Sequence, residues 1–274
     1  GSSGRSSTDI LNLTITNTAN YRFMLKDIHS FNFMIGQEGV DFRQEGFMVS
    51  TRGQNNDFLT NVTSGTRATS WSDVAAAYAY VSFFGRGEYN YDDRYYADFS
   101  VRTDGSSRFG KNNRFGTFPA FSLGWRLSEE AFIKDNTDVI SDLKLRFGWG
   151  QTGNQEIDNY ATYNIYTTDY GIGDPTWGAV LGTAYNITGK GTGTLLSGFK
   201  MNQRGNDNLK WETTTQTNIG LDFGLFNQSL YGSAEYYMKK TKDILVKPPY
   251  LAAIGEGGNR WINGASMENW GLEF

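Results

Sequence analysis

Eleven charged side chains of this 274-residue chain fall in the polar register of alternating segments, and they are its most informative residues for chemistry. Side chains two apart lie on the same face of a β-strand. Charges gathered on one face can pair across neighbouring strands, contact another domain or line a path for a polar solute. The eleven residues are Arg86, Glu88, Asp98, Arg102, Arg126, Lys144, Arg146, Glu212, Asp222, Glu235 and Lys239.

Residues for catalysis are sparse. The only histidine, His29, lies beside a predicted turn and has no evident partner. The carboxylate pairs Asp92–Asp93 and Glu129–Glu130 also fall in predicted turns, whereas glycoside hydrolysis needs two carboxyl groups facing each other across a cleft. The chain has no cysteine, which excludes disulfides, thiolate metal sites and cysteine nucleophiles. We therefore predict that the chain is not an enzyme and needs no cofactor.

One segment offers oxygen ligands of the type that Ca²⁺ prefers, Asn206-Asp207-Asn208. The same three residues suit a plain polar turn equally well in composition. Since a turn needs no ion, the sequence favours the turn, and we predict no metal site.

The elements that must position the charges are strands. Nine segments alternate apolar and polar residues: Tyr95, Ala97, Phe99 and Val101, for example, interleave with Tyr96, Asp98, Ser100 and Arg102. Most segments reach the roughly 9–11 residues that a tilted strand needs to cross a bilayer. We expect strands at 10–24, 29–39, 78–91, 94–104, 117–127, 142–151, 209–224, 229–245 and 266–274.

The connections between these strands alternate in length. Short turns are expected at 25–28, 92–93 and 225–228, with an intermediate connection at 128–141 that includes a helical turn capped by Ser128. Short periplasmic turns and long extracellular loops are typical of outer-membrane barrels. The long loops are 40–77, 105–116, 152–208 and 246–265.

Aromatic residues cluster beside the short turns. Such a cluster predicts an aromatic girdle at the membrane surface, although cross-strand aromatic pairing gives the same pattern. On the girdle interpretation, Trp149 and Trp211 belong to a second girdle at the long-loop end. The residues beside the short turns are Tyr89, Tyr91, Tyr95, Tyr96, Trp125, Phe132, Phe223, Phe226 and Tyr231.

Composition agrees with a membrane barrel and with few other classes. Mean hydropathy is −0.50 and no apolar run of about 18 residues occurs, but only every second strand residue of a barrel faces lipid. A lysine or arginine in the middle of the lipid face would cost about 2–4 kcal/mol, so we expect the eleven charges to face the lumen. The net charge of −4, without a basic patch, gives no reason to expect nucleic acid as a partner.

An ordered series of motifs resembles a known family. It includes Phe83-Phe84-Gly85-Arg86, Arg102-Thr103-Asp104-Gly105-Ser106-Ser107-Arg108-Phe109-Gly110, Gly116-Thr117-Phe118-Pro119-Ala120-Phe121-Ser122-Leu123-Gly124-Trp125, Gly150-Gln151-Thr152-Gly153-Asn154-Gln155 and Asn208-Leu209-Lys210-Trp211-Glu212. The series resembles the SusC/RagA family of TonB-dependent outer-membrane transporters of Bacteroidetes, and it covers most of residues 80–274.

This resemblance implies an all-β fold, part of a large antiparallel transmembrane β-barrel. Such barrels have about 22 strands and enclose a plug, so residues 1–274 are expected to be a partial barrel domain of a longer protein, without the plug and the remaining strands. The implied function is active import of oligosaccharides or peptides across the outer membrane. The implied partners are TonB, acting through the plug, a SusD-like surface lipoprotein and outer-membrane lipid.

Loop residues are candidate contacts for substrate or for that lipoprotein. Arg108, Lys111 and Arg114 lie in a loop that faces substrate or the lid in the family. Tyr170, Trp177 and Tyr185 have rings that can stack on sugars or peptide side chains, or can pack within their own loop. The alternatives to active import are a passive porin-like channel and a soluble structural or adhesive β-protein.

Overall fold

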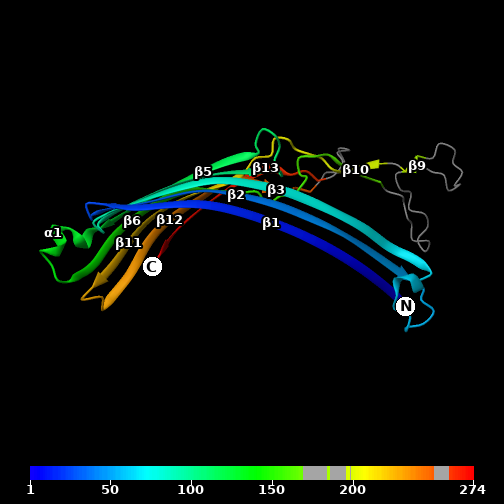
Figure 1. Ribbon diagram of the computed structural model, residues 1–274, viewed down its shortest axis with the longest axis horizontal. Coiled ribbons are helices and arrows are strands. Elements are labelled where there is room, and N and C mark those ends of the chain that lie inside the picture. Colours follow the sequence, from blue (N-terminus) through cyan, green and yellow to red (C-terminus); the bar gives the residue numbers. More distant parts are fainter. Residues whose placement is uncertain (169–183, 186–195, 198, 250–258) are drawn as a thin grey trace.

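The computed structural model describes residues 1–168, 184–185, 196–197, 199–249 and 259–274. Nine strands form one antiparallel sheet in the order β1-β2-β3-β4-β5-β6-β11-β12-β13, which Figure 1 shows as a single arched layer. The strands are β1 (Ser2–Leu25), β2 (His29–Arg52), β3 (Arg67–Tyr91), β4 (Tyr95–Ser106), β5 (Phe115–Arg126), β6 (Ile140–Asn154), β11 (Glu212–Leu225), β12 (Leu230–Val246) and β13 (Ile262–Glu273). The nine-stranded, all-β prediction is confirmed.

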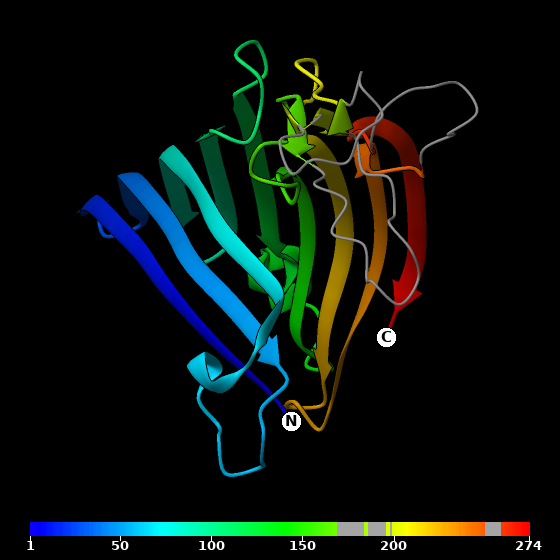
Figure 2. The same ribbon diagram turned by 90° about the vertical axis from the view of Figure 1, so that its right-hand side faces the viewer.

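Both edges of this sheet are open. β1 and β13 lie on opposite sides of the sheet (Figure 2), and neither pairs with a further strand among the described residues. Unpaired backbone N–H and C=O groups are expensive in lipid, so a sheet that crosses a membrane must close into a barrel. The fold is thus a segment of a barrel wall.

The short turns lie together at one end of the sheet, beside α1 (Ala131–Lys134) (Figure 1). Their backbone takes the left-handed conformation at Lys26 and Asp27, and again at Asp92 and Asp93. Tight hairpins need positive φ at their central residues, and aspartate tolerates it better than most residues do. The acidic pair Asp92–Asp93 therefore serves chain reversal.

Three strands are much longer than predicted. β1, β2 and β3 have 24, 24 and 25 residues, and the predicted loop 40–77 shrinks to 53–66. The prediction failed because the apolar register becomes polar beyond Gly39: Asp41 and Arg43 occupy it and form an ion pair at 2.9 Å. On the opposite face Phe42 stacks on Tyr78, so apolar and polar residues occur on both faces here. Alternation therefore disappears although the hydrogen-bond ladder continues. The three strands extend past the rest of the sheet (Figure 1).

The long loop 152–208 also contains regular structure. Within it, β7 (Ile165–Thr168) pairs with β10 (Phe199–Gln203), and β8 (Ala184–Tyr185) pairs with β9 (Leu196–Ser197). A 3₁₀ turn, η1 (Val62–Ser64), lies in the connection between β2 and β3. No helix in the described ranges is long and apolar enough to span a membrane.

The helical turn after β5 forms, but its predicted cap is wrong. A 3₁₀ turn, η2 (Leu127–Glu129), precedes α1, and the residue before α1 is Glu130, which makes no side-chain cap. The Ser128 hydroxyl donates instead to the Asp142 carboxylate at 3.2 Å. A charged acceptor makes a stronger hydrogen bond than a backbone group, which explains why the serine turns away from the helix.

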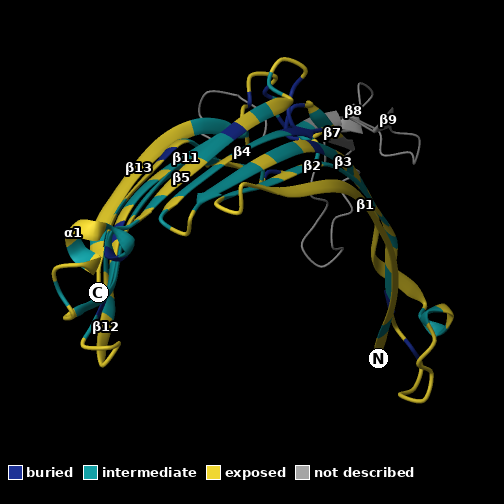
Figure 3. Cartoon of the chain, turned by 60° about the vertical axis from the view of Figure 1, so that its left-hand side comes forward, coloured by how far each residue is buried: buried dark blue, intermediate teal, exposed yellow. Residues whose placement is uncertain are grey.

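The two faces of the sheet differ in composition. One face, which we call the apolar face, presents large side chains to the surroundings; Ile35, Phe83 and Leu123 are 68%, 56% and 53% exposed. Figure 3 shows that exposed and intermediate residues dominate the sheet, with few buried ones. An exposed apolar surface of this extent marks contact with a membrane or with another protein.

Candidate solute path and its flanking loops

The strand register places all eleven predicted charged residues on the face opposite the apolar one. In the strand ladder, Glu88 lies opposite Asp98. Arg126 lies opposite Lys144, which in turn lies opposite Asp222, so charged positions follow one another from strand to strand. We call this the charged face. That it lines a lumen remains a prediction.

Arg102 is the centre of the first charged cluster. Its Nε donates to Asp104 at 2.6 Å, and its NH2 group donates to Glu38 at 3.1 Å and to Ser82 at 2.7 Å. The guanidinium also lies over the Phe84 ring, 5.3 Å from its centroid. The arginine is therefore held on several sides by the sheet itself.

Arg86 is the centre of a second cluster on β3 and β4. It donates to Asp98 at 2.6 Å and lies 2.7 Å from Glu88. Asn32 on β2 donates to the same Glu88 at 2.6 Å. The cluster thus ties together three adjacent strands.

Arg146 is the centre of the third cluster. It binds Asp222 through two bonds of 2.7 and 2.9 Å and Glu235 through one of 3.2 Å, and Asn218 donates to Glu235. Each of the three arginines is bound by two carboxylates, so each cluster holds one positive and two negative charges. The three clusters alone are therefore net negative, and Arg126, Lys144 and Lys239 on the same face offset this charge.

The remaining predicted charges lie beside these clusters. Lys144 Nζ stands 4.5 Å from the centroid of the Tyr96 ring, and Arg126 Nε donates to Asp142 at 3.0 Å. Glu212 accepts the Leu245 amide at 3.0 Å. Lys239 is aligned with Gln216 in the ladder.

Sequence reasoning missed two members of the Arg102 cluster, Glu38 and Asp104. Both occupy the charged register of strands that were predicted, so period-two counting from Arg102 and across β2 was the signal that could have found them. Their pairing with one arginine depends on register between strands, which one sequence does not reveal.

A small buried cluster lies at the long-loop end, and we call it the loop core. It consists of Phe109, Phe118, Ile157, Ala161, Leu209 and Trp211. Trp211 is 6% exposed; its ring lies 5.0 Å from that of Phe109 and 5.5 Å from that of Phe118, and its Nε1 donates to the Arg114 carbonyl at 3.2 Å. The prediction of Trp211 as a girdle residue is therefore wrong, because loops fold over it.

The predicted loop contacts divide into three kinds. Arg108 is engaged inside the loops: its guanidinium lies 4.3 Å from the Tyr78 ring centroid, and Nε donates to Asn159 at 2.9 Å. Lys111 and Arg114 are exposed. Tyr170 and Trp177 lie outside the described residues; Tyr185 falls in β8, but its side chain is not described. Their contact with substrate stays a prediction.

Two further contacts fix the loops to each other. Asp158 accepts Lys247 Nζ at 2.5 Å and Trp261 Nε1 at 2.9 Å. Partial burial raises the pKa of Asp158, but the hydrogen bonds from Lys247 and Trp261 outweigh it and hold the pKa below its ordinary value. Asp158 is thus an ionised bridge between two loops at neutral pH.

The predicted polar turn at 206–208 has a structural role. Asn206 is buried, donates to the Trp261 carbonyl at 2.9 Å and accepts from Arg260 at 3.2 Å.

The histidine beside the first short turn has a partner on β3: His29 Nδ1 lies 2.8 Å from the Tyr89 hydroxyl. Within the described part of the chain, no group of three or more metal-ligating side chains converges.

Comparison with known proteins assigns the family. The profile described as "TonB dependent receptor-like, beta-barrel" matches residues 1–274. This chain belongs to the TonB-dependent receptor β-barrel family. The TonB-dependent receptor SusC of Bacteroides thetaiotaomicron is 38% identical over 90% of this chain and 23% of its own length. The TonB-dependent receptor P3 of Formosa agariphila is 32% identical over 100% of this chain and 26% of its own.

Solved structures agree with this assignment. The RagAB peptide transporter matches 98% of this chain and 28% of its own with a TM-score of 0.82 at 29% identity. The ferric enterobactin receptor PfeA of Pseudomonas aeruginosa shares the fold alone, with a TM-score of 0.56 at 14% identity over 97% of this chain and 33% of its own. The chain spans about a quarter of the length of SusC and of P3. Its resemblance to the SusC/RagA family and its place in the outer membrane are confirmed, and this is a family of receptors and transporters.

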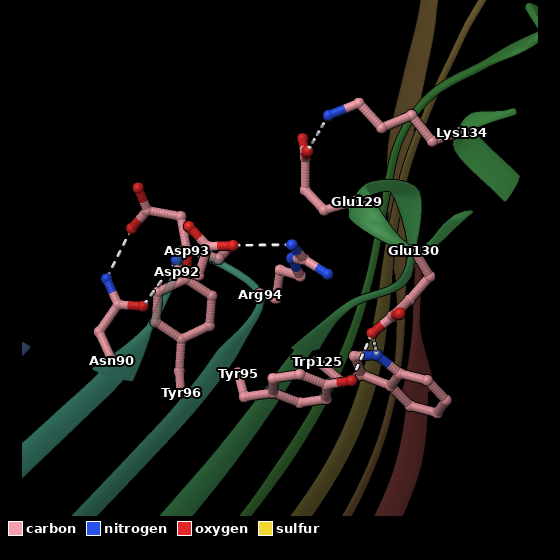
Figure 4. Close-up of polar contacts among 10 residues, drawn as sticks. All are labelled: Asn90, Asp92, Asp93, Arg94, Tyr95, Tyr96, Trp125, Glu129, Glu130 and Lys134. Carbon is pink, nitrogen blue, oxygen red and sulfur yellow. Dashed lines mark hydrogen bonds and ion pairs between the residues drawn. The ribbon is translucent and has the colours of Figure 1, made fainter. Parts of the chain in front are cut away.

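Aromatic side chains border the short-turn end of the TonB-dependent receptor wall. Figure 4 shows the Tyr95 hydroxyl and the Trp125 Nε1 both directed at Glu130, at 2.5 and 3.0 Å. These two bonds, that from Tyr95 first, hold the pKa of Glu130 below its ordinary value. The Tyr95 and Trp125 rings are stacked, with centroids 6.3 Å apart. Cross-strand pairing is therefore present, and the membrane girdle remains a prediction.

Proposed function

We propose that this chain forms part of the wall of a TonB-dependent importer and that its charged face lines the lumen. The observation that carries the proposal is the separation of the two faces. Three arginine–carboxylate clusters occupy one face, and exposed Ile35, Phe83 and Leu123 represent the other. Within a membrane only the second face is compatible with lipid.

The cargo in this proposal is an oligosaccharide or a peptide. The peptide alternative is supported by the similarity to the RagAB peptide transporter, and the oligosaccharide alternative comes from the family resemblance of the sequence. The paired charges of the charged face also support a polar cargo, because their side chains offer many hydrogen-bonding groups. TonB would supply the energy through a plug, and a SusD-like lipoprotein would cover the loop end.

The loop core supports our proposal that the lipoprotein binds at the long-loop end. It joins the connection between β4 and β5 to the segments that follow β6 and precede β11, with Phe109, Phe118 and Trp211 at its centre. A rigid platform at the long-loop end reduces the conformational entropy that binding a partner would cost.

The orientation of the wall can be tested with two adjacent residues on β5, Ser122 on the charged face and Leu123 on the apolar face. The cysteine substitutions Ser122→Cys and Leu123→Cys are made singly in the full-length parent protein, in a cysteine-free background, and labelled with an environment-sensitive fluorophore. In bilayers containing lipid-borne quenchers, the label at 123 is expected to be quenched and the label at 122 not. Equal quenching at both positions would contradict the proposed orientation.

Transport is tested separately in the native host. Deleting the parent gene is expected to abolish uptake of one class within a panel of oligosaccharides and peptides, and deleting TonB should abolish the same uptake. Uptake that persists without TonB would indicate a passive channel instead. Copurification of a surface lipoprotein with the tagged parent protein tests the partner.

A further inference from the structure

A groove crosses the apolar face near the short-turn end of the sheet. Its floor is Ala97, which lies in one cross-strand row between Tyr89 and Leu123. Leu145 and Phe147 of β6 complete the wall. Because a methyl group stands where its neighbours carry rings and branched chains, the row is hollowed at this point. The groove measures about 630 Å³, which is within the range of small-molecule sites, about 300–1,000 Å³.

The short-turn end of this groove is polar. Tyr95 and Trp125 form its edge, and both donate to the same oxygen, Oε1, of Glu130 (Figure 4). The second oxygen, Oε2, accepts no hydrogen bond from the described part of the chain. Glu130 thus presents a negatively charged acceptor directly where the apolar groove ends.

A cation lies on the same edge. Arg94 donates one NH2 bond to Asp92 at 2.7 Å, which leaves its other N–H groups for a ligand. Lys134, the other cation in this region, is held by Glu129 at 2.8 Å. Each cation is therefore paired with one carboxylate, and Arg94 still has N–H groups that can donate to a phosphate.

The net charge at the polar edge of the groove determines which lipid headgroup can bind there. Around this edge the carboxylates Asp92, Asp93, Glu129 and Glu130 outnumber the cations Arg94 and Lys134, and the nearby Arg126 is paired with Asp142. An anionic headgroup would be repelled by this balance. A headgroup that carries an ammonium as well as a phosphate would meet complementary groups, the ammonium at Glu130 and the phosphate at Arg94.

We propose that this groove is a binding site for one phospholipid with an ammonium-bearing headgroup of the phosphoethanolamine class. An acyl chain lies over Ala97 between Tyr89 and Leu123. The ammonium donates to Oε2 of Glu130, and a phosphate oxygen accepts from Arg94. The inference depends on the apolar face meeting lipid, and it is independent of what the protein transports.

The test measures lipid retention by the full-length parent protein, so a failure of transport would not affect it. The protein is delipidated in detergent, mixed with equal amounts of phosphatidylethanolamine and phosphatidylglycerol, and examined by native mass spectrometry. The wild type is expected to retain one phosphatidylethanolamine preferentially. Glu130→Gln should reduce that retention about tenfold, which is the effect of losing one charge-assisted hydrogen bond, while Glu129→Gln, whose carboxylate is bound to Lys134, should not.

A second variant tests the groove itself. Ala97→Phe fills the floor of the groove on β4 and should abolish retention of the bound phospholipid. Ala75→Phe, on the apolar face of β3 but outside the groove, should not. If Ala97→Phe does not fold, judged by heat-modifiable migration of the barrel, Glu130→Gln, which lies outside the groove floor, still decides. Equal retention of both lipids by the wild type, or unchanged retention in Glu130→Gln, would overturn the proposal.

Discussion

The Arg146 guanidinium donates two hydrogen bonds to the Asp222 carboxylate across the β6–β11 ladder, from Nε at 2.7 Å and from NH2 at 2.9 Å. Bidentate arginine–carboxylate pairs fix geometry as well as charge. Since Glu235 on β12 also binds Arg146, a single side chain connects three strands of the charged face.

Replacing Arg146 with leucine should destabilise the barrel, because two carboxylates would lose their shared cation. Both partners are about one third exposed, and solvent screening therefore limits the expected loss to about 1–2 kcal/mol. Urea unfolding of the full-length parent protein in detergent measures it. Lys239→Gln on the same face is the control and should change the free energy of unfolding by less than about 0.5 kcal/mol; an equal loss in both variants would contradict the role given to Arg146.

Trp211→Ala should disrupt the loop core. The side chain is almost fully buried between Phe109 and Phe118, and truncating a buried tryptophan costs about 3–5 kcal/mol. Limited proteolysis should then cut the loops faster while the strands stay intact. Trp71→Ala, at a position 60% exposed on β3, should leave the proteolysis rate unchanged.

Gly110→Ala should loosen the same loops by a different route. A Cβ at this position would lie 2.3 Å from the Asp207 carbonyl oxygen, so the two loop backbones would have to separate, at a cost of about 1–3 kcal/mol. Gly148→Ala is the matched control, because nothing lies within 4 Å of its added Cβ. Thermal unfolding and proteolysis should distinguish the two alanines; similar behaviour would mean that the loops do not approach as closely in solution.

The Asp158 bridge should respond to acid. Its folded pKa lies below the unfolded value of about 3.9, so its stabilising contribution is complete above that value and disappears as the pH falls through the folded pKa. The environment of Trp261 reports the change, measured as the fluorescence difference between the parent protein and its Trp261→Phe variant. Asp158→Asn should show no such acid transition, whereas Glu156→Gln should retain it.

The sequence alone determined the number of strands in the main sheet, its two faces and the positions of the short turns. Alternation at Tyr95 to Arg102 reflects a physical necessity, because a strand between lipid and a polar interior must change character at every residue. Asp92 and Asp93 likewise marked a turn because few residues accept positive φ. The eleven charged residues were found by the same period.

Only the tertiary structure decided the rest. β2 and β3 continue far beyond their alternating segments because backbone hydrogen bonds, which carry no side-chain signature, hold them together. Arg102 meets Glu38 across 64 positions of sequence, and Trp211 is buried because separate loops fold over it. Each of these features depends on which distant segments come into contact, and the alternation of residues along one segment does not specify those contacts.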